Sequence, residues 1–318
     1  MVLGEWKPGM NNFIRICAGM TLPLCLSIQT LCAKDYTLES AQEAMAKNDA
    51  DAAYFLAKSY ARGNGVGQDY AKAAEYSLKA AEQGHALAQN DLAALYARGL
   101  GVKQDYEAAA AWYRKAAEQG DALAQYSLGH IYSIGRGVPK DMDKALQWWR
   151  KSADQNQPEA QNALGHYYFW RELRSTNGTP TSSDYAEAAK WLGKAAGQGY
   201  VESMNNLAYL YEHGMGVERD LDQALKWYRL AAENGHAKAQ GNLGLMYFEG
   251  RYVKRDLVEG YKWLKLSANG GDGIGRRYVE IYADKKLLTE DELTEAERLA
   301  EEFQRQHNHK GAEPVKAN

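Results

Sequence analysis

Cysteine is scarce in this chain and confined to one end. All three cysteines, Cys17, Cys25 and Cys32, lie in the first 33 of the 318 residues. If that segment is removed, disulfides, thiolate catalysis and cysteine-ligated zinc or iron–sulfur sites are excluded together. Basic charge is not in excess either, because the formal net charge is -3 at pH 7. Without a basic field to hold a phosphate backbone or an anionic membrane, nucleic acid is not expected as a partner.

The chain is instead rich in glycine and in two of the aromatic residues. It holds 30 glycines, 22 tyrosines and 8 tryptophans against 5 phenylalanines, a skewed usage that a repeated motif produces. Hydrophobic residues make up 45% and charged residues 25% of the sequence. These values lie close to the globular average and exclude collagen-like, mucin-like and wholly disordered chains.

The N-terminal segment has the pattern of an export signal. Residues 16–33 contain no charged side chain, follow Arg15 and end in a small residue, which is typical of a secretory signal peptide. Pro23 and Gln29 interrupt the stretch, so it suits a membrane span of about 20 apolar residues poorly. We therefore expect residues 1–33 to be a signal peptide and the mature protein to be periplasmic, with no stable membrane anchor after cleavage.

Self-comparison shows a repeat of 36 residues. The string Lys-Ala-Ala-Glu-Gln-Gly ends at Gly84 and again at Gly120, and its last position recurs four more times, once after an interval of 43. Such a period indicates a solenoid. The six units are 49–84, 85–120, 121–156, 157–199, 200–235 and 236–271, the fourth of which carries a seven-residue insertion.

Each unit contains two helical patterns separated by a glycine turn. A leucine is followed four residues later by a tyrosine, as at Leu92 and Tyr96, and this spacing places both on one helical face. The turn reads Gly-x-Gly-Val in most units, as at 99–102, and its glycines supply the positive φ that ends a helix tightly. The second helix stops at the repeated glycine.

Two positions recur at the start of the second helix and along it. An aspartate precedes each Ala-rich run, where we expect it to cap the helix with about 1 kcal/mol of stabilisation. A large aromatic residue follows seven positions later, and its period favours packing between units over sugar or base stacking. The aspartates are Asp69, Asp105, Asp141, Asp184, Asp220 and Asp256. The aromatic residues are Tyr76, Trp112, Trp148, Trp191, Trp227 and Trp263.

Taken together, these positions form a known motif. It reads Ala-x-x-x-Leu-Gly-x-x-Tyr, then Gly-x-Gly-Val-x-x-Asp, then Ala-x-x-Trp-Tyr-x-Lys-Ala-Ala-x-x-Gly, and is clearest across 124–153 and 207–235. Over 49–271 the chain resembles the Sel1-like repeat, a relative of the tetratricopeptide repeat. The resemblance implies an all-α, right-handed α-solenoid of antiparallel helix pairs with a concave surface. Sel1-like proteins with a claimed β-lactam-binding activity are cysteine-rich, and their disulfides are absent here.

The two ends depart from the repeat. Residues 34–48 are expected to form an N-terminal helical cap. Residues 272–303 read as a degenerate C-terminal repeat with a charged capping helix, whose outer face is solvated as a terminal cap requires. The polar tail over 304–318 is expected to be disordered.

No residue pattern typical of catalysis or cofactor binding is found. The sequence has no G-x-S-x-G elbow, no Walker loop and no G-x-G-x-x-G after a strand. His130 and His166 occupy equivalent positions in adjacent units, but a zinc site needs further ligands that neither cysteine nor an H-E-x-x-H helix supplies. We interpret these histidines as part of a binding surface. No catalytic residue, metal or cofactor is therefore predicted.

Positions that vary between the units are the candidates for binding. Counting from each repeated leucine, positions -2, +2, +5 and +6 lie off the buried face of the first helix and form a separate stripe. Aromatic, amide and histidine side chains on this stripe suit a protein ligand. The predicted residues are Tyr126, His130, Ser133 and Ile134, then Asn162, His166, Phe169 and Trp170, then Asn205, Tyr209, Glu212 and His213. Some of them are equally compatible with ordinary contacts between units.

The inserted loop of the fourth unit is the second candidate surface. It spans residues 170–183 and opens with Trp170, Arg171 and Arg174. Binding residues gather on loops held by rigid scaffolds, and tryptophan and arginine are enriched in interface hot spots. A merely tolerated insertion is the alternative, because surface loops accept extra residues easily.

These features predict a non-enzymatic periplasmic scaffold that binds one protein partner. Exported Sel1-like proteins include immunity proteins that neutralise phospholipase effectors of type VI secretion, and a groove-forming acidic protein can cover an active site without chemistry of its own. Immunity against such an effector is therefore the specific hypothesis. The alternatives are an envelope adaptor or regulator, a binder of host proteins such as immunoglobulin, and a peptidoglycan- or β-lactam-active enzyme, which would need a nucleophile or an acid–base pair.

Overall fold

The described part of the chain folds into helices. The computed structural model describes residues 36–173 and 182–309, and every regular element within them is an α-helix, which confirms the predicted all-α class. The elements are α2 (Leu38–Ala46), α3 (Ala50–Arg62), α4 (Tyr70–Glu82), α5 (Ala86–Arg98), α6 (Tyr106–Glu118), α7 (Ala122–Ile134), α8 (Met142–Asp154), α9 (Pro158–Leu173), α10 (Ser182–Gly197), α11 (Val201–His213), α12 (Leu221–Glu233), α13 (Ala237–Glu249), α14 (Leu257–Asn269), α15 (Gly273–Lys285) and α16 (Glu290–His309).

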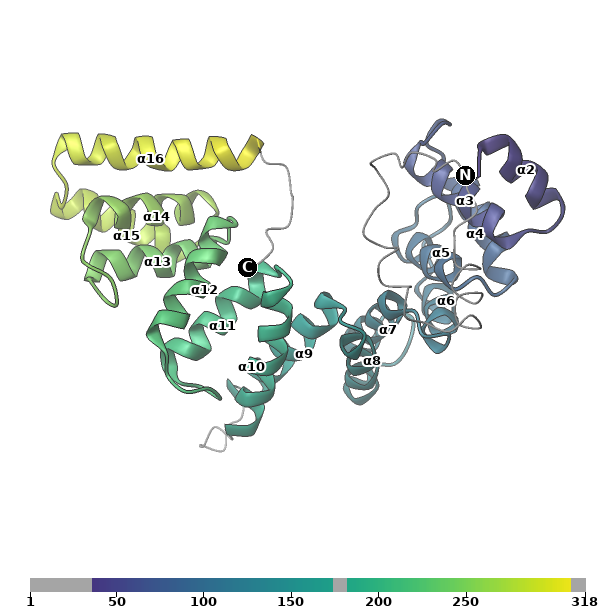
Figure 1. Ribbon diagram of the computed structural model, residues 1–318, viewed down its shortest axis with the longest axis horizontal. Coiled ribbons are helices and arrows are strands. Elements are labelled where there is room, and N and C mark those ends of the chain that lie inside the picture. Colours follow the sequence, from purple (N-terminus) through teal and green to yellow (C-terminus); the bar gives the residue numbers. More distant parts are fainter. Residues whose placement is uncertain (1–35, 174–181, 310–318) are drawn as a thin grey trace, which may run out of the picture.

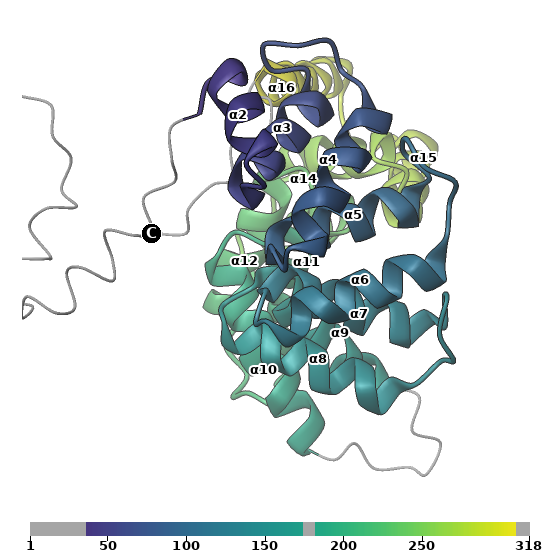
Figure 2. The same ribbon diagram turned by 90° about the vertical axis from the view of Figure 1, so that its right-hand side faces the viewer.

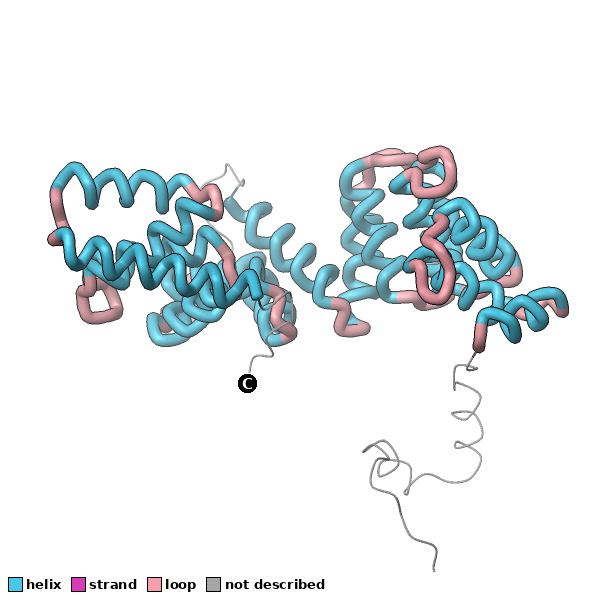
Figure 3. The backbone as a smooth tube through the Cα atoms, turned by 90° about the horizontal axis from the view of Figure 1, so that it is seen from above, coloured by secondary structure: helices cyan, strands magenta, loops and turns pink. Residues whose placement is uncertain are grey.

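Neighbouring helices pack in chain order to form a solenoid. Each helix from α2 to α14 packs against the next one along the chain, and α16 then lies on α14. The stack curves from α2 at one end to α16 at the other (Figure 1), and in the view toward α2 the helices α3 to α8 descend one below another (Figure 2). Short loops join the helices (Figure 3). The first helix of each repeat therefore alternates with the second along the whole stack.

Five of the six predicted aspartate caps are confirmed. Asp69 Oδ1, for example, accepts hydrogen bonds from the backbone N–H groups of Ala71 and Lys72 at 3.0 Å. The prediction is wrong for Asp184, because α10 begins at Ser182, before this residue. The Asp184 carboxylate instead pairs with Arg171 Nε at 3.0 Å, joining α9 to α10 across the insertion.

In three of the turns the second glycine is needed for close contact between units, whereas the sixth unit holds Tyr252 at this position with a φ of +64°. Gly137 has a φ of +71°, and a Cβ atom built on it would lie 2.2 Å from the carbonyl oxygen of Tyr106 in the preceding unit. Gly101 and Gly216 repeat this arrangement against the preceding second helices. Any side chain at these positions would force two neighbouring units apart.

Large side chains on the second helices fill the space between paired helices. These side chains are Tyr113, Trp149, Leu192, Tyr228 and Leu264, all buried. In the first unit the equivalent residue is Ser77. The repeated aromatic stands one position earlier and packs on the core beneath a lysine, as Trp112 does with Lys115 Nζ 3.9 Å from its ring centroid. This supports the interpretation of the aromatic ladder as packing.

One buried side-chain oxygen between the second and third units lacks a hydrogen bond. The side-chain oxygen of Asn90 is the buried acceptor without a hydrogen bond among the described residues. At the equivalent place two units later, Asn162 Oδ1 accepts a hydrogen bond from Ser203 Oγ at 2.8 Å. The residue that corresponds to Ser203 next to Asn90 is Ala124, which has no hydroxyl group.

Substituting Ala124→Ser is therefore expected to stabilise the protein by about 1 kcal/mol, because the new hydroxyl can donate to Asn90 Oδ1. Ala88→Ser is the matched control. The position is equivalent, but the preceding unit offers Tyr54 instead of asparagine, so this variant buries an unpaired hydroxyl and loses stability. Urea denaturation measures both changes, and a gain in the control or a loss in Ala124→Ser would refute the assignment.

At the N-terminal end of the described residues, α2 packs on the first repeat. In α2, Thr37 and Ser40 form a reciprocal capping box, and Ala41 is buried against the first repeat. Residues 1–33, the predicted signal peptide, lie outside the described residues. No helix in the described ranges is long and apolar enough to cross a membrane.

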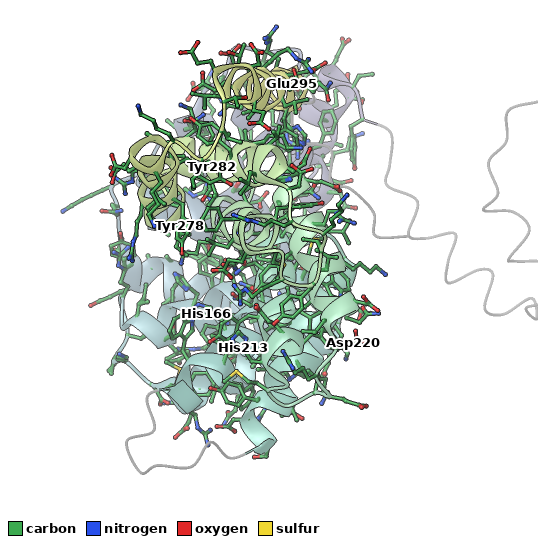
Figure 4. The ribbon with its side chains drawn as sticks, turned by 90° about the vertical axis from the view of Figure 1, so that its left-hand side faces the viewer. His166, His213, Asp220, Tyr278, Tyr282 and Glu295 are labelled. Atoms are coloured by element: carbon green, nitrogen blue, oxygen red, sulfur yellow. The ribbon has the colours of Figure 1, made fainter. Side chains whose placement is uncertain are left out.

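The C-terminal helix is longer than predicted. Disorder was expected from residue 304, but α16 continues to His309, so the expectation is wrong for 304–309. The reason is aromatic packing. The ring centroid of Phe303 lies 5.2 Å from that of Trp263 on α14, and the His307 ring stacks on Phe303 with a centroid separation of 3.9 Å. Glu295 faces outward on this helix and pairs with Arg298 (Figure 4). Residues 310–318 lie outside the described residues.

A histidine caps α13 and makes stability depend on pH. His236 Nδ1 accepts a hydrogen bond from the N–H of Ala239 at 3.2 Å, which requires an unprotonated nitrogen. Burial lowers the pKa of His236 below its ordinary value. Because the unfolded chain then binds more protons, the stability that this residue contributes is present above about pH 6.5 and is lost as pH falls below it.

We expect His236→Asn, which keeps a capping side chain, to reduce the loss of unfolding free energy between pH 7 and pH 5. His213→Asn, on an exposed histidine, serves as the control and should leave that loss unchanged. An identical pH dependence in His236→Asn and the unmodified protein would contradict the capping role.

Candidate partner-binding groove

The first helices of the repeats line the inner side of the curve. Within the six repeats, α9 packs directly on α11, and no two second helices of the described residues approach each other to this extent there. Side chains bridge neighbouring first helices, as Phe169 does with Tyr209 at a ring separation of 5.8 Å. Elements on the inside of a curved stack lie closer together than those on the outside, so the first helices form the concave surface.

The predicted stripe is accessible at several positions. On α7, His130 and Ile134 are exposed, and on α9 and α11 so are Trp170 and His213. The exposed fractions are 43% for Ile134 and 41% for Trp170. Tyr126, Ser133, Asn162, His166, Tyr209 and Glu212 are half-buried. We refer to the accessible surface of α7, α9 and α11 as the central groove.

Aromatic rings link α9 to α11 in the central groove. Trp170 Nε1 donates a hydrogen bond to His166 Nε2 at 2.6 Å, and the Trp170 ring lies 5.5 Å from Phe169. Phe169 contacts Tyr209 on α11, and Tyr209 stacks on His213 at 4.1 Å. His166 and His213 lie in the same part of the molecule in Figure 4. The result is one continuous row of rings with a tryptophan exposed at its end.

A second, smaller aromatic pair lies on α7. Tyr126 and His130 stack at a ring separation of 6.4 Å. Partial burial and the nearby Arg136 guanidinium lower the pKa of His130, so the imidazole is neutral near pH 7. Burial and the nearby carboxylates of Glu159 and Glu202 raise the pKa of Tyr126. The pair therefore presents uncharged aromatic surface beside two acidic side chains.

Two predicted residues are not accessible. Phe169 is 6% exposed and belongs to the main hydrophobic core, and Asn205 is 8% exposed. The expectation that they form part of the open stripe is therefore wrong. Phe169, at position +5, lies close to the edge of the buried face, and its large ring turns inward. Asn205 is held by the next unit, because its Oδ1 accepts a hydrogen bond from Asn242 Nδ2 at 3.4 Å.

Two charged candidates, Glu212 and Arg171, form ion pairs or hydrogen bonds within the fold. Glu212 accepts a hydrogen bond from the Tyr228 hydroxyl at 3.0 Å and faces Arg251 at 3.7 Å, so it bridges α11, α12 and the next turn. Arg171 is engaged by Asp184. Arg174 and most of the insertion lie outside the described residues.

Sequence reasoning missed one row of the groove. Leu87 and Leu123 are 49% and 44% exposed in the first turns of α5 and α7, and Glu159 and Glu202 occupy the same position in α9 and α11. This position lies five residues before the repeated leucine. At 100° per residue this position lies on the same stripe as position +2. Helical periodicity could therefore have predicted that these residues belong to the exposed surface.

The described residues contain no group of three or more histidine, aspartate, glutamate or cysteine side chains that could hold a metal ion. The capping aspartates lie one unit apart, and each accepts hydrogen bonds from its own helix. The central groove therefore offers aromatic, aliphatic and acidic surface for binding.

Comparison with known proteins identifies the repeat. The Sel1 repeat pattern matches residues 50–85, 86–121, 122–157, 158–200, 201–236 and 237–272, one residue later than the units drawn from the sequence. No curated protein matches. A Sel1 repeat protein from Oxalobacter formigenes is 28% identical with a TM-score of 0.62, covering 74% of this chain and 100% of that chain.

Two other solved structures are similar to this chain with TM-scores below 0.5. A protective antigen of uropathogenic Escherichia coli displaying an SLR fold is 28% identical, with a TM-score of 0.39 over 88% of this chain and 76% of that chain. An immunity protein from Pseudomonas aeruginosa is 23% identical, with a TM-score of 0.41 over 71% of this chain and 82% of that chain. With six matched repeats, the chain belongs to the Sel1 repeat family, whose members are generally scaffolds for protein–protein interaction.

Proposed function

We propose that the central groove holds a protein partner and that this binding is the whole activity of the protein. The row of rings from Trp170 to His213 supports the proposal most directly, because it places an exposed tryptophan at the end of aromatic side chains that are already fixed by packing. Fixed aromatic anchors lose little side-chain entropy on binding and dominate interface hot spots.

The specific form of the proposal is immunity. The partner would be a secreted phospholipase-type effector of a type VI secretion system, neutralised in the periplasm by occlusion of its active site. Two features support this form: the resemblance to exported Sel1-like proteins, and a mildly acidic chain whose described residues offer a concave surface and no group of three or more side chains that could hold a metal ion. Occlusion needs shape and affinity, which a solenoid supplies.

Affinity capture from the native cell envelope, with the tagged protein as bait, tests this proposal. Recovery of a single secreted lipase at stoichiometric amounts, followed by inhibition of its activity by the purified protein, is the expected result. A membrane sensor or a secretion component would instead identify an envelope adaptor, and capture of immunoglobulin would identify a host-binding protein. Either outcome would overturn immunity while leaving protein binding intact.

A further inference from the structure

A cavity opens on the inner surface of the first two units. It has a volume of about 180 Å³ and is lined by α3, α4 and α5. Its walls are largely aliphatic, with Ala57, Ala61, Ala73, Ala94 and Leu95 among the lining residues. Lys58, Asp91 and Arg98 supply the charged side chains of the lining.

The cavity exists because one core residue is small. In the other five repeats the position of Ser77 is held by a buried Tyr, Trp or Leu that fills the space between the paired helices. Ala94 adds to the hollow, since the equivalent residues of the next three units are His130, His166 and Tyr209. Unit one therefore lacks the large side chain that closes this space in the other five units.

A polar group inside the cavity is unpartnered. Ser77 is 2% exposed, yet its hydroxyl makes no hydrogen bond within the described residues. Buried polar groups in folded proteins are normally hydrogen-bonded. The hydroxyl is thus available to a group that enters the cavity from the concave surface.

The charges at the cavity favour an anion. Lys58 Nζ pairs with Asp91 at 2.9 Å, and the Tyr54 hydroxyl donates to the same carboxylate at 3.2 Å, so the acidic side chain is already engaged. Arg98 is exposed, and no carboxylate lies within salt-bridge distance of it in the described ranges. One lysine and one arginine against one aspartate leave a net positive charge.

We propose that this cavity is an anchoring subsite on the concave surface formed by the first helices, separate from the central groove, and that it takes one phenyl or branched aliphatic side chain of the partner with a carboxylate beside it. The size is suitable, because an apolar cavity of about 150 Å³ accommodates benzene. Arg98 binds the carboxylate, the alanine and leucine side chains contact the apolar group, and Ser77 lies at the cavity wall. The subsite deepens the proposed function by naming the chemistry of the partner segment, but it lies in units one and two and is testable without the partner.

Methyl NMR of the full chain with 3-phenylpropionate as the probe tests the subsite. We expect saturable shifts of the Ala73, Ala94 and Leu95 methyl resonances, and an affinity at least about fivefold weaker for the neutral 3-phenylpropionamide, as for loss of one charge-assisted contact. Ser77→Leu, which introduces the residue found at this position in two other units, should abolish the shifts and raise the melting temperature.

Two further variants separate binding from folding. Arg98→Gln should weaken binding of the acid and leave binding of the amide unchanged, whereas Arg305→Gln on α16 should alter neither. Equal binding by the Ser77→Leu variant, equal affinity for acid and amide, or no shift of the lining methyl groups at millimolar probe would each overturn the subsite. Failure here leaves the central groove untouched, and failure of effector capture leaves the probe result standing.

Discussion

Replacing Trp170 and Tyr209 together by alanine is expected to weaken partner binding by about two to three orders of magnitude, because each aromatic hot spot is worth about 2 kcal/mol or more. Trp170 supplies exposed ring surface, and Tyr209 holds the row of rings together through Phe169 and His213. Titration of the captured partner by calorimetry measures the change.

Trp227→Ala is the matched control for this loss. Trp227 has the same residue type but lies on the second helix α12, half-buried beside Lys226. It should leave the affinity within about threefold of the unmodified protein, as expected for a residue outside the interface. Unchanged affinity in the double variant, or equal loss in Trp227→Ala with both proteins folded, would refute the central groove as the binding site.

The largest expected effect on stability comes from Gly137→Ala. Its added Cβ would lie 2.2 Å from the Tyr106 carbonyl oxygen at a φ of +71°. The left-handed conformation costs an L-residue about 1 kcal/mol, and the overpacking between units adds about 1–3 kcal/mol. We expect a total loss of about 2–4 kcal/mol, and in a solenoid this loss falls on the interface between the second and third units.

Gly120→Ala isolates the backbone contribution. Gly120 also has a positive φ, +95°, but a Cβ atom there would meet nothing within 4 Å. This variant should lose about 1 kcal/mol, the conformational cost alone. Equal losses in the two variants, measured by urea denaturation, would show that close contact between units is not what fixes the second glycine of the turn.

The repeat made the fold predictable from the sequence. Because one pattern occurs in six copies, the helix pairs can be predicted even where a single position departs from it. The predicted aspartate caps are confirmed in the five units whose second helix begins directly after the aspartate. The exception, Asp184, follows the insertion, where the start of α10 is shifted to Ser182. Periodicity therefore failed at the one unit whose length differs.

The binding surface was predictable in part. Helical spacing placed His130, Ile134, Trp170 and His213 on the exposed stripe, but it could not show that Phe169 turns into the core, because burial depends on the ring of Tyr209 in the next unit. Predicting the cavity at Ser77 likewise requires knowing which side chains of neighbouring helices pack around it. A small residue leaves a cavity only where other helices enclose the space around it, and the pattern of a single helix does not show which helices these are.

Hydroxyl-radical footprinting of the protein with its captured partner tests the central groove most directly. Trp170 and Tyr209 should be oxidised more slowly in the complex than in the free protein, while Trp227 on the second helix should react at an unchanged rate. Protection of Trp227 together with unchanged oxidation of Trp170 and Tyr209 would place the partner on the outer surface and contradict the account.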